Sequence, residues 1–123
     1  SARKGKTKMT TYIIQGRYPR EAIEGMINKP EDRAVAVAAL AKSVGGKLLD
    51  YYVTFGESDF LVIIESGRGK SETDIMAALF AAAAAGGVAD LKTTVAVRSK
   101  DAMKAMRGAK KILKSFQSAG QAG

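Results

Sequence analysis

Apolar and β-branched residues gather in the middle of the chain into two runs separated by a short polar turn. The runs are Leu48–Phe55 and Phe60–Glu65, and the turn is Gly56-Glu57-Ser58-Asp59. Valine, isoleucine, tyrosine and phenylalanine suit a pleated, half-buried surface, whereas glycine, serine and aspartate suit a turn. The pattern therefore predicts a β-hairpin at the centre of the chain.

Strands and helices are predicted on both sides of this hairpin. Two further β-branched runs, Met9–Gln15 and Leu91–Arg98, predict outer strands. Helical spacing of apolar residues predicts four helical segments. The first is the short segment Arg20–Ile27. The second starts around residues 28–32, with Pro30 near its first position, and ends at a Gly45-Gly46 C-cap. The third is Glu72–Ala85, preceded by a capping box of Ser71 and Asp74, and the fourth is Lys100–Phe116.

With the short segment Arg20–Ile27 and the helix after it counted as one connection, the order of these elements is β-α-β-β-α-β followed by one more helix. This order predicts an α+β fold, the ferredoxin-like plait, with a four-stranded antiparallel sheet and both long helices on one face. Strict alternation puts large apolar residues on both faces of the hairpin. It assigns Leu49, Tyr51, Val53 and Phe55 to one face of the first run, and Leu48, Asp50, Tyr52 and Thr54 to the other. An exposed apolar sheet face favours a homo-oligomer, a dimer or a multiple of dimers, paired sheet against sheet.

The composition excludes several classes of chemistry. The chain has 123 residues, which fits one domain, and it contains neither cysteine nor histidine. Serine–histidine and cysteine–histidine catalysis, disulfides and zinc thiolate sites are therefore excluded. We predict no catalytic residue set, no metal site and no cofactor. Neither a secretory signal nor a membrane-spanning stretch is recognisable, so we expect a cytoplasmic protein without a membrane span.

The net charge of +8 lies at the two ends of the chain. Residues 1–9 carry four basic residues, and residues 99–123 carry six against one acid, whereas residues 10–98 carry ten basic and eleven acidic ones. We divide the chain into a basic disordered arm (1–8), the ferredoxin-like domain (9–98), a basic amphipathic helix (99–117) and a frayed tail (118–123). Nucleic acid association through these ends would be weak and non-specific.

One candidate site is a small-ligand site around the hairpin turn. Its polar groups would come from the turn and its aromatic groups from two strands, and the residues are Tyr12, Tyr52, Gly56, Glu57, Ser58 and Asp59. The alternative is a structural turn, in which Gly56 supplies a positive φ and Asp59 bonds the nearby backbone. The tyrosines would then serve packing in the core or at an interface.

A second candidate is an anion site in the loop that precedes the second long helix. It comprises Arg68, Gly69, Lys70 and Ser71, at the start of a helix where backbone amides attract anions. A nucleotide-binding P-loop is excluded, because the position of its first glycine is occupied by Ile64. The alternative is a plain linker, since glycine and lysine are common loop residues.

Several segments resemble the GYD domain family, which comprises small bacterial and archaeal proteins without an assigned biochemical role. The segments are Met9–Arg17 (MTTYIIQGR), Pro30–Arg33 (PEDR), Gly45–Asp59 (GGKLLDYYVTFGESD) and Gly86–Thr94 (GGVADLKTT). The resemblance covers roughly residues 9–98. The family takes its name from a Gly-x-Tyr-Asp turn, and here Ser58 stands in place of that tyrosine.

The same turn also resembles the Gly-x-x-Asp hairpin of the ligand-sensing domains in the leucine-responsive regulator family. Those domains are dimeric α/β barrels that bind amino acids at subunit interfaces, and the resemblance implies a related dimeric barrel. We therefore interpret the chain as a non-enzymatic, homo-oligomeric module that binds a small ligand or a protein through its sheet face. The alternatives are a cofactor-free oxygenase, because related barrels host monooxygenases, and a polyanion-binding protein that uses its basic tails.

Overall fold

The computed structural model describes residues 9–116, so the predicted arm at 1–8 and the predicted tail at 118–123 lie outside the described residues. Four strands and four helices follow one another along the chain. They are β1 (Thr11–Arg17), α2 (Arg20–Asn28), α3 (Arg33–Ser43), β2 (Lys47–Val53), β3 (Phe60–Glu65), α4 (Glu72–Ala84), β4 (Ala89–Ala96) and α5 (Ser99–Ser115).

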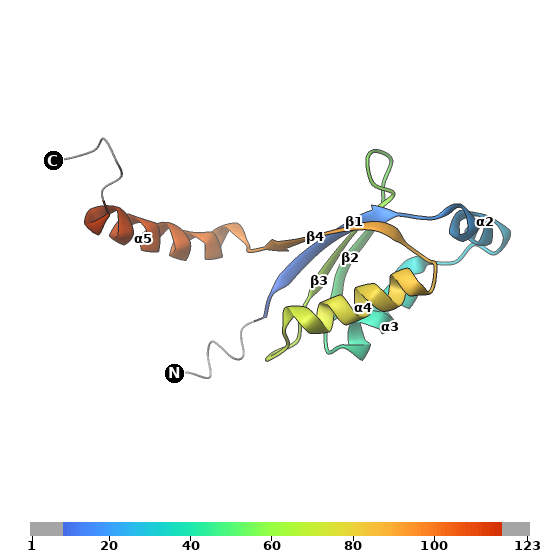
Figure 1. The fold of residues 1–123 in the computed structure, drawn as a ribbon, viewed down its shortest axis with the longest axis horizontal. Coiled ribbons are helices and arrows are strands. Elements are labelled where there is room, and N and C mark those ends of the chain that lie inside the picture. Colours follow the sequence, from blue (N-terminus) through green and yellow to red (C-terminus); the bar gives the residue numbers. More distant parts are fainter. Residues whose placement is uncertain (1–8, 117–123) are drawn as a thin grey trace.

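The four strands form one antiparallel sheet in the order β2-β3-β1-β4. The central hairpin joins β2 to β3, and two helical crossovers bring β3 and β4 to either side of β1. Figure 1 shows α3 and α4 together on one side of this sheet. This is the ferredoxin-like plait, and the predicted α+β fold class is confirmed.

Helix α3 begins later than the sequence suggests. Pro30 lies in the linker before the helix, so its predicted place near the first helical position is wrong. Asp32 is the N-cap instead, and its carboxylate accepts a hydrogen bond from the Ala34 N–H at 3.0 Å. The side chain of Asp32 thus satisfies a backbone donor that has no partner within the helix.

Two predicted helix ends are confirmed. Gly45 follows α3 with a φ of +77° and donates its N–H to the Lys42 carbonyl at 3.0 Å. Only glycine adopts this left-handed conformation at little cost, which explains its place after a helix. The capping box before α4 is also present, and the Asp74 carboxylate accepts the Ser71 N–H at 2.9 Å.

The core lies between the sheet and helices α3 and α4. Alternate residues of β1 and β3 point into it, because successive side chains of a strand face opposite ways. The buried cluster consists of Tyr12, Ile14, Tyr18, Ala41, Phe60, Val62, Ile64 and Ile75.

Strand β2 departs from the strict alternation that the sequence suggests. Its register against β3 shifts between Leu48 and Asp50, where a β-bulge adds a residue. As a result, Leu48 and Tyr51 both pack against the core, although alternation assigns them to opposite faces. The strand also ends at Val53, and the Phe55 side chain beyond it is fully exposed.

The sheet face opposite α3 and α4 is called the open face below. No helix among the described residues covers it (Figure 1). Register and alternation assign three residues of each strand to this face. They are Thr11, Ile13 and Gln15 of β1, Lys47, Asp50 and Tyr52 of β2, Leu61, Ile63 and Glu65 of β3, and Lys92, Thr94 and Ala96 of β4.

Helix α5 continues from β4 and points away from the sheet and the other helices (Figure 1). Its apolar stripe is exposed, including Met106, Leu113 and Phe116. Its basic residues are exposed too, so both faces of this helix meet solvent in the single chain. Across residues 9–116, no helix has the length and apolar character that crossing a membrane requires.

Candidate ligand-binding site

The structure places the two tyrosines of the first candidate site on opposite faces of the sheet. Tyr12 is buried on the helix side of β1, where its neighbours are core residues. Tyr52 lies on the open face of β2 and is 54% exposed. A single ligand in one chain therefore does not touch both rings.

The hairpin turn ties β2 and β3 to the end of β1. The Asp59 carboxylate accepts a hydrogen bond from the Tyr18 N–H at 2.9 Å, and the Asp59 N–H donates to the Gly16 carbonyl at 2.7 Å. The Thr54 hydroxyl donates to the carbonyl of Ser58 at 2.6 Å. Asp59 and Ser58 thus hold backbone segments together.

The remaining turn residues, Gly56 and Glu57, are exposed. Gly56 does not have the positive φ that the sequence suggests, and a Cβ added there would meet nothing within 4 Å. The expectation of a left-handed glycine in this turn is therefore wrong. Glu57 is the acidic side chain of the turn that faces solvent.

The loop of the second candidate site is packed against the end of α3. A Cβ added at Gly67 would lie 2.0 Å from the Gly45 carbonyl oxygen, so the two backbones touch. The Lys70 side chain lies along Gly45 as well. Because the Asp74 carboxylate already accepts the Ser71 N–H, a negative charge occupies the start of α4 where an anion would bind.

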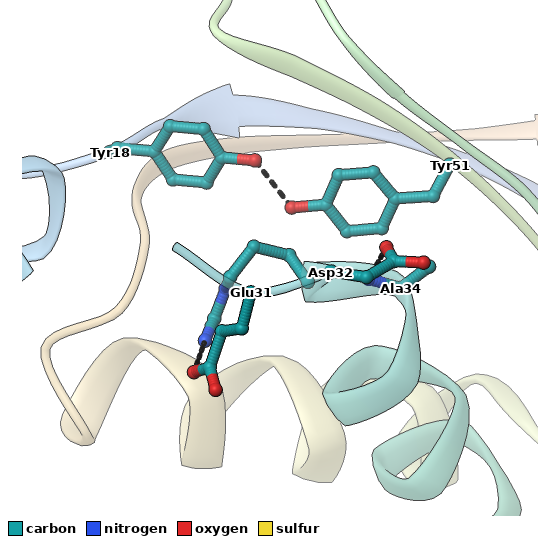
Figure 2. A network of polar contacts seen from close by, with 6 residues as sticks. Tyr18, Glu31, Asp32, Ala34 and Tyr51 are labelled. Atoms are coloured by element: carbon teal, nitrogen blue, oxygen red, sulfur yellow. Dashed lines mark hydrogen bonds and ion pairs between the residues drawn. The ribbon is translucent and has the colours of Figure 1, made fainter. Parts of the chain in front are cut away.

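An aromatic cluster that the sequence did not single out lies under the start of α3. The Tyr18 and Tyr51 hydroxyls are hydrogen-bonded to each other, and Figure 2 shows them pointing toward one another. Phe60 lies beside both rings, with ring centroids 5.1 Å from Tyr18 and 6.2 Å from Tyr51. The two tyrosines come from the end of β1 and from β2, and β3 carries Phe60 between them.

The two buried tyrosines, Tyr18 and Tyr12, both have a phenol pKa above the ordinary value. Burial raises the pKa of the Tyr18 phenol above its ordinary value of 10.0, and the hydrogen bond with Tyr51 raises that pKa further. The positive charge of Arg33 partly opposes this rise. Burial also raises the pKa of Tyr12, with a contribution from Glu72. Phenols that stay protonated near neutral pH suit hydrogen bonding to a ligand better than proton abstraction.

A small apolar cavity and a larger groove adjoin this cluster. The cavity, about 60 Å³, lies between the sheet and helices α3 and α4, and Tyr51 forms part of its wall. The groove, about 700 Å³, lies between α2, α3 and α4, and Tyr18 lines it. Five residues line both spaces, so the groove and the cavity adjoin. They are Arg33, Val37, Leu40, Ala82 and Val88.

Among residues 9–116, no group of three or more acidic side chains is placed to hold a metal ion. Sequence reasoning missed Tyr18, Tyr51 and Arg33 as candidate site residues. The features of the sequence that could have pointed to these residues are Arg33 in the PEDR segment and the pair of tyrosines at positions 51 and 52. Nothing in the sequence shows that Tyr18 and Tyr51, which lie 33 positions apart, meet.

Comparison with known proteins identifies a family. No curated protein matches the chain. Among solved structures, a transcriptional regulator of Neisseria meningitidis, crystallised as a complex with L-Met, is similar over 80% of this chain, with 14% identity and a TM-score of 0.45. The similarity covers 56% of that regulator, so the chain spans little more than half of its length. The model of the GYD domain matches residues 12–106, and the chain therefore belongs to the GYD domain family.

Proposed function

We propose that the chain is a homo-oligomeric module that binds a small ligand, and that two copies pair through their open faces. The observation that carries the pairing is an apolar band at the centre of the open face. It consists of Ile13, Tyr52, Leu61 and Ile63, and no described helix covers it. A contiguous apolar patch of this kind marks an interaction site.

A second copy of the chain suits this band better than an unrelated partner. A two-fold axis brings the same patch of each copy together, so the patch must be complementary to itself. An apolar centre meets that condition, and the rim carries both signs of charge, with Lys47 opposite Glu65 on neighbouring strands and Lys92 at the far edge. Two sheets stacked about 10 Å apart, with their helices outside, give a dimeric α/β barrel.

The ligand-binding part of the proposal is supported by the space behind the sheet. An apolar cavity beside an open groove, with a few polar groups in the shared wall, is the usual form of a small-molecule site. The hydrogen-bonded pair of Tyr18 and Tyr51 supplies hydrogen-bonding groups there. This favours binding over catalysis.

The variant Ile63→Glu tests the pairing. Ile63 lies near the centre of the open face, on the same strand and face as Glu65 and opposite Asp50 of β2. Two buried carboxylates facing each other would oppose pairing. We expect light scattering to give the mass of one chain for Ile63→Glu and a higher mass for the wild type. Val35→Glu, at an exposed position on α3, is the matched control and should keep the wild-type mass. Equal masses for all three proteins would contradict pairing through this face.

A further inference from the structure

Arg33 stands where the groove meets the inner cavity. It is the one charged residue in the wall of the cavity, whose other lining residues are apolar apart from the Tyr51 hydroxyl. It also lines the groove, and its side chain is partly exposed, so a molecule in the groove can reach it. The groove carries one further basic residue, Lys29, and two acids, Glu21 and Glu31. The groove has no excess of positive charge, so Arg33 is a candidate anion-binding residue because of its position between the groove and the cavity.

The hydrogen-bonding capacity of Arg33 is largely unused in the described residues. Its ion pair is with Glu31, at 3.9 Å between Nη1 and Oε1. The Glu31 side chain is 61% exposed and the Arg33 side chain 31% exposed, and ion pairs this long and this exposed are weak. A guanidinium has five N–H donors in a fork that matches a carboxylate, so most of them remain for a ligand.

The tyrosine pair offers one more donor at the same junction. Tyr18 lines the groove and Tyr51 lines the cavity, and their hydroxyls meet between the two spaces. One hydrogen bond between two hydroxyls uses one proton, and the second hydroxyl proton remains free to donate. Arg33 lines the groove together with Tyr18 and the cavity together with Tyr51, so the guanidinium and the hydroxyl pair border the same two spaces.

We propose that this junction binds a small organic carboxylate with a short apolar end. The carboxylate meets the Arg33 guanidinium and the free tyrosine hydroxyl, and the apolar end enters the cavity beneath α3 and α4. A cavity of about 60 Å³ has room for about four methyl-sized groups, since a water needs roughly 10–15 Å³ of the same measure. The remainder of a larger ligand would lie in the groove. This inference names the ligand class of the proposed module, and it does not depend on how the copies pair.

The test uses two probes of equal shape, hexanoate and hexanamide, added to the full-length protein with labelled methyl groups. We expect hexanoate to shift the NMR signals of Val37, Leu40 and Val88 saturably, because these residues line the junction. Hexanamide should bind at least about tenfold more weakly, because it lacks the charge that the guanidinium recognises. No shift at these methyls, shifts confined to Leu61 and Ile63 of the open face, or equal binding of both probes would overturn the proposal.

Two variants test the charge of Arg33 and the volume of the cavity independently. Arg33→Gln should lower hexanoate affinity to the level of hexanamide and leave hexanamide binding unchanged. Ala82→Leu places a larger side chain in the shared wall and should abolish binding of both probes, whereas Ala83→Leu, exposed on the same helix and outside both linings, should bind them as the wild type does. If Arg33→Gln retains the preference for hexanoate, Arg33 is not the carboxylate site and the proposal fails. The mass measurements above report on pairing alone, so the two proposals fail separately.

Discussion

Gly67 is the glycine, among those the structure describes, at which the packing leaves least room for a side chain. Its backbone touches that of Gly45, and an added Cβ would lie 2.0 Å from a carbonyl oxygen and 3.0 Å from the carbonyl carbon. Backbone atoms cannot rotate away as a side chain does. The φ of Gly67 is not positive, so the requirement for glycine at this position is steric and comes from a contact distant in sequence.

We predict that Gly67→Ala lowers the free energy of unfolding by about 1–3 kcal/mol, the usual cost of overpacking. Gly56→Ala is the matched control, since Gly56 has open space around it and no positive φ, and it should change stability by less than about 0.5 kcal/mol. Urea midpoints of the three proteins measure both effects. Equal midpoints for the two variants would show that the α3–β2 turn and the loop before α4 separate readily.

Tyr18 links the site to the pH dependence of stability. Its pKa in the folded protein is raised above 10.0, so the folded state keeps a proton that the unfolded state loses as the pH rises past that value. The contribution of Tyr18 is therefore fully present below about pH 10 and is lost at higher pH.

We predict that Tyr18→Phe makes the protein about 1 kcal/mol less stable near neutral pH, because Tyr51 loses its partner. The variant should also lose less stability than the wild type between about pH 9 and pH 11, although Tyr12, with its raised pKa, keeps part of the dependence. Urea midpoints across this range give both slopes. Parallel slopes would contradict a neutral, buried Tyr18.

At the scale of elements, the bulge in β2 decides which aromatic residue reaches the site. Without it, Leu48 and Tyr51 would face opposite ways, and with it both reach the core. Tyr51 then meets Tyr18, and Tyr52 is turned to the open face. The bulge thus turns Tyr51 toward the proposed ligand site and Tyr52 toward the proposed pairing surface.

The elements themselves could largely be predicted from local signals. Glycine after α3 and the Ser71–Asp74 box before α4 are short-range features, and both are where the sequence indicates. The site could not be predicted in the same way. Tyr18 and Tyr51 meet only because β3 lies between β1 and β2, and a bulge within a run of apolar residues leaves no distinct pattern.

Helix α5 is the element least tied to the rest of the chain. We predict that removal of residues 1–8 and 109–123 leaves the fold and the oligomeric state essentially intact, because Leu113 and Phe116 are 69% and 59% exposed in the single chain. Thermal melting and light scattering would check this. A lower mass or aggregation would show that the apolar stripe of α5 packs against a neighbouring copy, since burying each of these side chains contributes about 1.5–3 kcal/mol.

The same truncation tests association with polyanions. The removed segments carry much of the basic charge, including Lys110, Lys111 and Lys114. We expect the full chain to be retained on duplex DNA at low salt, with a log–log salt slope of about −0.9 for each phosphate neutralised, and the truncated chain to be released. Equal retention of both proteins would place the DNA contact on the folded body instead.

At the scale of the whole molecule, the sheet separates two surfaces to which we assign different proposed roles. One side is covered by α3 and α4 and contains the cavity, the groove and the tyrosine pair. The other side presents the apolar band of Ile13, Tyr52, Leu61 and Ile63 without a described cover. Pairing through one face leaves the other free for a ligand, so assembly and binding need not compete.

Native mass spectrometry of the full chain at micromolar concentration tests the central claim most directly, because it counts the subunits and detects any small molecule they retain. Each chain has a mass of 13.0 kDa. We predict an even multiple of this mass for the wild type and the mass of one chain for Ile63→Glu under the same conditions. A wild-type spectrum dominated by single chains would contradict the account, because the apolar band of the open face would then stand in water with nothing to cover it.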